Sequence, residues 1–129
     1  MIIKIISIDK TVIEDNVDII TLRGSDGTYG IMKNHENLIS DIVEGVVVLK
    51  NSIEEKRYYV DRGILKSENQ EVTIITEFCK NIDNLEKNII EQKVSLLKKG
   101  LEDEEKKNIQ KDFIRNELKQ YISILQHIK

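Results

Sequence analysis

The sequence of 129 residues contains no proline, no tryptophan and a single cysteine, and aromatic residues make up only 5% of it. One cysteine excludes a disulfide within the chain and leaves any zinc site short of thiolate ligands. No apolar run reaches the length of about 18 residues that a membrane span needs. The first residues also lack the charged region and cleavage site of a signal peptide. We therefore expect a soluble protein of a reducing compartment.

Charge is abundant but balanced. The chain carries 20 basic and 23 acidic residues, for a net charge of −3. Both signs are interspersed, whereas a protein that coats nucleic acid needs clustered lysine and arginine. We therefore expect no nucleic-acid partner.

The part of the chain before Asn81 is typical of β-structure. Short runs rich in Ile, Val, Thr and Tyr alternate with turns that contain Gly, Asn and Asp. The expected strands are residues 2–8, 11–14, 17–23, 38–42, 46–50, 56–60, 64–66 and 72–76. Many short strands indicate a sandwich, although a closed barrel would give the same pattern.

From Asp83 onward the apolar residues follow a helical period. The pattern predicts two amphipathic helices that form an antiparallel hairpin. We expect the seam between them to consist of Leu85, Ile89, Val94, Leu97, Ile109, Phe113, Leu118, Tyr121 and Leu125. A two-helix hairpin is marginal alone. Its apolar side must therefore pack on the β half or on another chain, and both alternatives stay open.

The expected helix ends are marked by charge and by glycine. Lys98 and Lys99 followed by Gly100 favour the end of the first helix, because cations suit the C-terminal dipole and glycine tolerates a positive φ. The run Asp103-Glu104-Glu105 favours the start of the second helix.

Candidate catalytic groups are few. Cys79 and His35 could be imagined as a nucleophile and base, but Cys79 ends an apolar run, where an inert buried thiol is common. The glycine-dense stretch from Gly24 to Gly30 lacks the lysine of a P-loop and is interpreted as a tight turn between strands. We expect no catalytic site, no metal site and no cofactor.

The segment TLRGSDGTYGIMKNHENL, residues 21–38, resembles the epsilon subunit of F-type ATP synthase, where a G-x-x-G-x-x-G turn precedes a histidine and a leucine. The similarity continues through EGVVVL (44–49), YYVDRGIL (58–65) and EVTII (71–75). The order and spacing of these blocks cover most of the β half.

This resemblance implies a ten-stranded β-sandwich over residues 1–81, followed by a regulatory two-helix hairpin over residues 82–129. It implies a non-catalytic subunit of the central stalk that binds the γ subunit and the c-ring and couples their rotation. It also implies that the hairpin inhibits ATP hydrolysis and can reach the α and β catalytic subunits. The expected location is the cytoplasmic face of the bacterial inner membrane, with membrane contact only through the complex. The coupling ion of such a complex is either the proton or sodium.

The resemblance also implies which residues contact partners. A turn facing the c-ring would consist of Ser25, Asp26, Gly27, Thr28, Tyr29 and Gly30. Asn34, His35 and Glu36 would lie in the neighbouring loop at the γ and ring contacts. Relatives usually have proline and glycine beside this histidine, and this chain does not.

The nucleotide motif of some family members is degenerate here. Where those members have an arginine at the start of the first helix, this chain has Glu86. A carboxylate facing polyphosphate is repulsive, so we predict weak or no ATP binding.

Two alternatives of other classes stay open. One is a free-standing β-sandwich binding module whose hairpin serves for dimerisation. The other is an enzyme that acts through Cys79 and His35.

Overall fold

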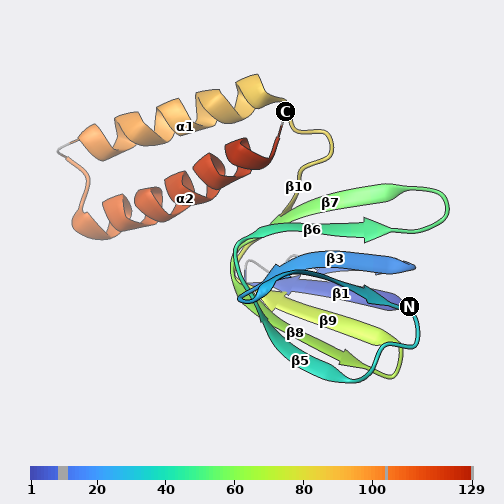
Figure 1. Cartoon of the computed structure of the whole chain (residues 1–129). Coiled ribbons are helices and arrows are strands. Elements are labelled where there is room, and N and C mark those ends of the chain that lie inside the picture. Colours follow the sequence, from blue (N-terminus) through green and yellow to red (C-terminus); the bar gives the residue numbers. More distant parts are fainter. Residues whose placement is uncertain (9–11, 104, 129) are drawn as a thin grey trace. The chain divides into compact units, whose positions relative to one another are not determined.

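The computed structural model describes residues 1–8, 12–103 and 105–128. The chain divides into two compact units, Met1–Asp83 and Asn84–Lys129. The first unit is a β-sandwich and the second is a pair of helices (Figure 1).

The described residues form ten strands in two five-stranded sheets, as the resemblance implied. The first sheet has the order β2 (Val12–Asn16), β1 (Ile2–Ser7), β9 (Glu71–Thr76), β8 (Gly63–Glu68) and β5 (Leu38–Ile42). The second has the order β10 (Cys79–Asn81), β7 (Glu55–Val60), β6 (Gly45–Lys50), β3 (Ile19–Gly24) and β4 (Gly27–Met32). β1 and β9 pair in parallel, and the other described pairings are antiparallel. Two separate sheets make the fold a sandwich rather than a closed barrel.

The core lies between the two sheets and follows the strand alternation predicted from the sequence. Ile3 and Ile5 of β1 are fully buried, as are Val72 and Ile74 of the neighbouring β9. Because successive side chains of a strand point to opposite faces, one set fills the core and the other lies on the outer face.

Two strands escaped the sequence analysis. β4 begins at Gly27, inside the stretch that was interpreted as a turn, and β10 has only three residues. In β4 only Ile31 is buried and Tyr29 is half-buried, so its apolar signal is weak.

The first compact unit includes two residues beyond the expected boundary at Asn81. The Ile82 amide donates a hydrogen bond to the Arg57 carbonyl at 3.0 Å. The Arg57 amide lies 3.1 Å from both carboxylate oxygens of Asp83. Both residues are thus bonded to β7, which explains why the first compact unit extends to Asp83.

An ion cluster joins the two sheets at one edge. The Lys56 Nζ of β7 lies 3.0 Å from Asp15 of β2 and 3.3 Å from Glu54. These partners, first of all the hydrogen bond to Asp15, raise the pKa of Lys56 above its ordinary value of 10.5. The cluster therefore favours the charged lysine in the folded state.

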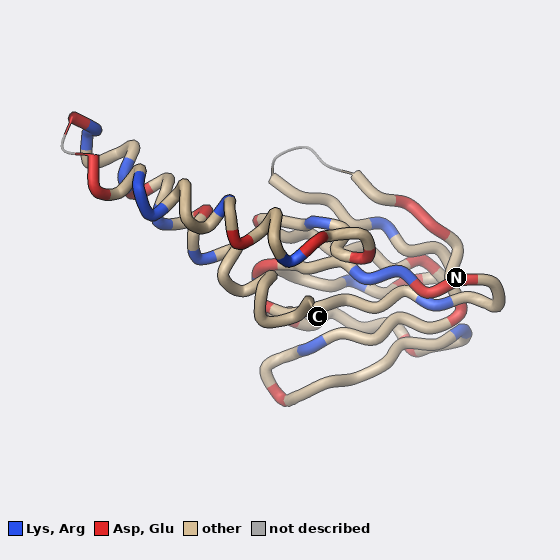
Figure 2. Tube along the Cα trace, turned by 90° about the horizontal axis from the view of Figure 1, so that it is seen from above, with Lys and Arg blue, Asp and Glu red and all other residues tan. Residues whose placement is uncertain are grey.

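The second unit is the predicted helical hairpin, with α1 at Lys87–Glu102 and α2 at Asn108–His127. The helices lie side by side (Figure 1), and Lys93 Nζ of α1 lies 5.8 Å from the centre of the Tyr121 ring of α2. Acidic and basic residues are interspersed along the hairpin (Figure 2). No helix among the described residues is long and apolar enough to cross a membrane.

The predicted helix ends were wrong. Gly100 lies within α1, which continues to Glu102. A Cβ at Gly100 would lie 3.3 Å from Ile114 Cδ1, so this glycine allows the two helices to approach closely. Asp103 accepts a hydrogen bond from the Glu105 amide at 3.0 Å in the connection rather than capping α2, and Glu104 lies outside the described residues.

The seam differs from the predicted one by a rotation of the helices. Val94 and Leu97 are buried, but the prediction is wrong for Ile89, Ile109 and Phe113, which are exposed. The predicted residues that are half-buried are Leu85, Leu118, Tyr121 and Leu125. Successive helical residues are rotated by about 100°. Ile89 and Phe113 each precede a residue that turns inward, buried Ile90 and half-buried Ile114, and so point away from the seam.

Candidate functional site

The β3–β4 connection is a two-residue turn formed by Ser25 and Asp26. Gly27 follows at φ 121°, a conformation that side chains rarely adopt. The Ser25 hydroxyl donates to Asp41 Oδ1 at 3.2 Å, which ties the turn to β5. The expected turn over residues 25–30 is therefore too long, because residues 27–30 belong to β4.

β4 is an edge strand that connects the two predicted contact regions. Thr28 and Gly30 are exposed on it, and Tyr29 packs over Gly24, where an added Cβ would lie 2.8 Å from the ring. The turn before β4 and the loop after it lie at opposite ends of six strand residues, a span of about 20 Å. The predicted residues thus do not form one cluster but the two ends of one exposed edge.

The loop of Lys33 to Asn37, which we call the histidine loop, follows β4 and carries three exposed predicted residues, Asn34, His35 and Glu36. Asn34 has φ 65°. The His35 Nδ1 lies 2.6 Å from the Glu36 carbonyl oxygen. Since a carbonyl only accepts hydrogen bonds, Nδ1 is the donor of this bond, which leaves Nε2 available to a partner.

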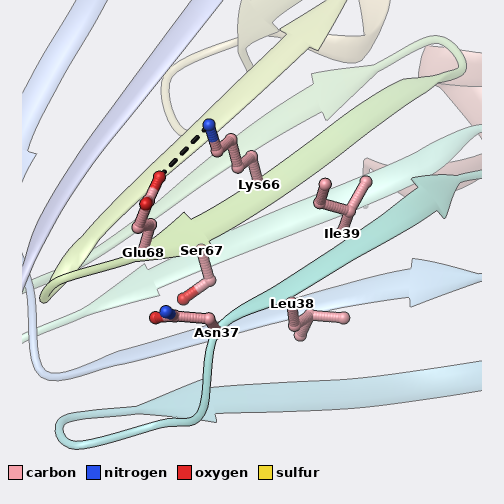
Figure 3. A pocket seen from close by; sticks show the side chains of 6 residues that line it. All are labelled: Asn37, Leu38, Ile39, Lys66, Ser67 and Glu68. Atoms are coloured by element: carbon pink, nitrogen blue, oxygen red, sulfur yellow. Dashed lines mark ion pairs between the residues drawn. The ribbon is translucent and has the colours of Figure 1, made fainter.

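An open pocket of about 380 Å³ lies directly after the histidine loop, between the start of β5 and the end of β8 (Figure 3). Its six lining residues are Asn37, Leu38, Ile39, Lys66, Ser67 and Glu68. Lys66 and Glu68 form an ion pair at 3.1 Å, and Ile39 is 73% exposed. The pocket thus combines an aliphatic side chain with a neutralised charge pair, which suits a protein surface rather than a charged small ligand.

An aliphatic row crosses the outer face of the first sheet, and the sequence analysis missed it. The strand registers place Val12, Ile6, Ile75 and Ile64 next to one another on four adjacent strands. Val12, Ile75 and Ile64 are between 56% and 58% exposed. Ile6 is half-buried. Exposed apolar rows of this kind often mark a protein interface. The sequence signal for this row was isoleucine at strand positions such as Ile6 and Ile75, which alternate with the buried positions and therefore point away from the core.

The candidate catalytic pair is not assembled. Cys79 belongs to the hydrophobic core, whereas His35 lies on the exposed histidine loop. In the described part of the chain, no group of three or more His, Cys, Asp or Glu residues could hold a metal ion. Glu86 precedes α1 as its exposed N-cap residue and makes no side-chain capping bond.

Comparisons with known proteins point to one family. Residues 1–81 match the family model described as ATP synthase, Delta/Epsilon chain, beta-sandwich domain. The chain is 31% identical over 91 residues to the ATP synthase epsilon chain of Clostridium botulinum (strain Alaska E43 / Type E3), a match that covers 70% of this chain and 68% of the relative. It is 29% identical over 104 residues to the ATP synthase epsilon chain of Rickettsia bellii (strain OSU 85-389), covering 77% and 94% of the two chains.

Solved structures share the fold at low sequence identity. A chain of the Euglena gracilis mitochondrial ATP synthase (OSCP/F1/c-ring) superposes with a TM-score of 0.63 at 13% identity, covering 98% of this chain and 77% of that one. A chain of the Tetrahymena thermophila mitochondrial ATP synthase central stalk and c-ring gives a TM-score of 0.57 at 9% identity, covering 97% and 96%. At such identities the likeness concerns the fold alone.

Proposed function

Since the chain belongs to the family of ATP synthase delta and epsilon chains, a family of non-catalytic subunits, we propose that it works as the epsilon subunit in the central stalk of an F-type ATP synthase. In this role it fastens γ to the c-ring, so that rotation of the ring is transmitted to the shaft. The single observation that supports the proposal best is the family match over residues 1–81, which include all ten strands. The proposed location is the cytoplasmic face of a bacterial inner membrane, and only the complex contacts the bilayer.

The exposed edge formed by β4, its turn and the histidine loop is the proposed contact surface for the c-ring and γ. Most of its exposed side chains are small or polar, with Met32 an exposed apolar exception, and the Ser25–Asp41 hydrogen bond and the β3–β4 ladder hold its backbone. A rigid edge of this kind can transmit force without a large change of shape. The aliphatic row on the first sheet offers γ a second, apolar area.

Hydrogen exchange of the full chain tests this surface, measured alone, with γ, and with γ on a detergent-solubilised c-ring. We expect residues 24–30 and the histidine loop to gain protection, beyond what the β3–β4 ladder and the Asn34 hydrogen bond give the free chain, when the partners are present. His35→Ala should weaken ring binding. Ile53→Ala serves as the matched control, because Ile53 is 91% exposed on the separate β6–β7 turn. Equal binding by both variants, or no added protection in either segment, would contradict the proposed surface.

We further propose that the hairpin is a regulatory arm that inhibits ATP hydrolysis by reaching the α and β catalytic subunits. Its support is the exposed apolar surface of Ile89, Leu96, Ile109 and Phe113, which the α1–α2 seam leaves uncovered. Such a surface allows two packing states separated by a few kcal/mol.

Truncation tests the arm. The cut belongs after Asp83 rather than after Asn81, because Ile82 and Asp83 are bonded to β7. A synthase that carries residues 1–83 should assemble normally but hydrolyse ATP faster than the enzyme with the full chain. A truncation after Asn81 is the control for damage to the sandwich, and it should assemble less well. Unchanged hydrolysis in the 1–83 enzyme would count against an inhibitory arm.

A further inference from the structure

We propose that Gln70 is a positioning residue that holds the histidine loop in its partner-binding conformation, an inference that rests on the proposed function of that loop. Gln70 lies in the β8–β9 turn, far from the histidine loop in sequence. It belongs neither to that loop nor to β4 and its turn. Its side-chain amide and Asn34 form a reciprocal pair of hydrogen bonds, which we call the amide clasp.

The amide clasp joins both polar ends of the Gln70 side chain to one residue. The Asn34 backbone amide donates to Gln70 Oε1 at 3.2 Å, and Gln70 Nε2 donates to Asn34 Oδ1 at 3.3 Å. The backbone of Gln70 is itself fixed, because its carbonyl accepts a hydrogen bond from the Ile2 amide at 3.0 Å. The clasp therefore connects the loop to the centre of the first sheet through β1.

The β8–β9 turn places the backbone of Gln70 in the left-handed region, which glutamine seldom adopts, and the clasp gives a reason for a glutamine at this position. Asn69 and Gln70 form a two-residue hairpin turn with φ values of 53° and 65°. A turn of this kind strongly prefers glycine at its second position, and asparagine tolerates the left-handed region far better than glutamine does. A glycine at position 70 would relieve the strain but could not reach Asn34.

The other contacts described for the histidine loop fix it less well. His35 bonds to the carbonyl of the next residue, which does not connect the loop to the body. Lys33 pairs with Asp18 at 3.1 Å through half-exposed side chains, and such pairs stabilise little. The clasp is exposed as well, but it bonds the backbone of the loop directly at Asn34. The amide clasp is thus the anchor that sets the backbone of Asn34, the residue immediately before His35.

Three variants of the full chain separate positioning from stability. Gln70→Gly removes the clasp and relieves the turn. Gln70→Glu keeps the acceptor for the Asn34 amide, and a flip of the Asn34 side chain offers its NH₂ group to the carboxylate, so it should rescue the clasp. Asn69→Gly relieves the neighbouring left-handed residue without touching the clasp and is the matched control.

The measurements are hydrogen exchange of the Asn34 amide, the melting temperature, and affinity for a detergent-solubilised c-ring that carries γ. Gln70→Gly should exchange about tenfold faster at Asn34 and bind the ring about tenfold more weakly, because two hydrogen bonds are lost, while its melting temperature does not fall. Gln70→Glu and Asn69→Gly should exchange and bind like the wild type.

The proposal is overturned if Asn34 exchange is unchanged in Gln70→Gly, or if exchange rises while ring affinity stays the same. A failure of the proposed function appears differently, because then the wild-type chain itself would not bind the ring and γ. That result would overturn the positioning role of Gln70 together with the proposed function. The exchange rate of the Asn34 amide would still show whether the clasp forms.

Discussion

Replacing Gly63 by alanine is expected to destabilise the sandwich by about 3 kcal/mol. A Cβ at Gly63, the first residue of β8, would overlap the Ile75 carbonyl oxygen and lie 3.0 Å from both Ile75 C and Thr76 Cα. All of these atoms belong to the backbone of β9, so no side-chain rotation relieves the clash. The strands would have to separate by about 1 Å, since carbon atoms pack at about 3.5–4.0 Å.

The magnitude follows from what that separation breaks. The Arg62 carbonyl, next to Gly63, accepts hydrogen bonds from the Thr76 hydroxyl at 3.1 Å and from the Glu77 amide at 3.4 Å. Weakening these two bonds costs about 1 kcal/mol each, and overpacking adds about 1–3 kcal/mol. The separation weakens some of these contacts without abolishing them. We therefore expect the free energy of unfolding to fall by about 3 kcal/mol, the lower end of the sum of these contributions.

Urea unfolding followed by circular dichroism measures this loss. Gly45→Ala is the matched control, because Gly45 also begins a strand and an added Cβ there meets only the Arg23 side chain at 3.7 Å, an ordinary contact. We expect Gly45→Ala to change the free energy of unfolding by less than about 0.5 kcal/mol. A Gly63→Ala chain as stable as the Gly45→Ala chain would refute the reasoning.

Three further predictions concern charge, packing and nucleotide. Asp15 and Glu54 raise the pKa of Lys56 in the folded chain, so the stability that the cluster contributes is present below pH 10.5 and is lost as pH rises through the folded value. Thermal melts up to about pH 12 should therefore show a steeper loss for the wild type than for Lys56→Arg, which stays charged, and identical profiles would contradict this. Ile124→Ala should lower the free energy of unfolding of the hairpin by about 2–4 kcal/mol, because Ile124 is fully buried, whereas exposed Phe113→Ala should cost less than about 0.5 kcal/mol by circular dichroism. Titration calorimetry with ATP should detect no micromolar binding, because the carboxylate of Glu86 precedes the first helix, where it would repel a polyphosphate, and micromolar affinity would overturn that expectation.

Most strands could be predicted from the sequence because their residues alternate between core and surface. β4 could not, because its exposed positions include Gly27 and Gly30, which resemble turn residues, and only Ile31 is fully buried. Its existence was implied by the family resemblance rather than by its own residues. Tertiary pairing with β3 overrides the weak local preference.

The helices could be predicted from their period, but their ends could not. Gly100 costs about 1 kcal/mol inside a helix, yet α1 continues because half-buried Leu101 follows and because the missing side chain lets Ile114 approach. The start of α2 depends on Gln110, whose side-chain oxygen accepts a hydrogen bond from the Lys107 amide at 3.1 Å. Neither contact is visible before the helices are placed together.

The contact residues came from resemblance, and the amide clasp that supports them came only from the structure. Nothing in the local sequence of Gln70 shows that its backbone is left-handed or that it meets Asn34, which lies 36 residues earlier. Hydrogen bonds between exposed polar residues that are distant in sequence produce no periodic pattern of residue types, so they cannot be predicted in the way that strands and helices are.

The parallel pairing of β1 with β9 imposes an order on synthesis. Ile2 leaves the ribosome well before its neighbour in the sheet, Glu71, which follows much later in the chain. Until that segment has emerged, the edge of β1 that β9 will occupy has no partner, and contacts this distant in sequence form slowly. The nascent chain must therefore keep an isoleucine-rich segment from aggregating until the β9 segment has emerged.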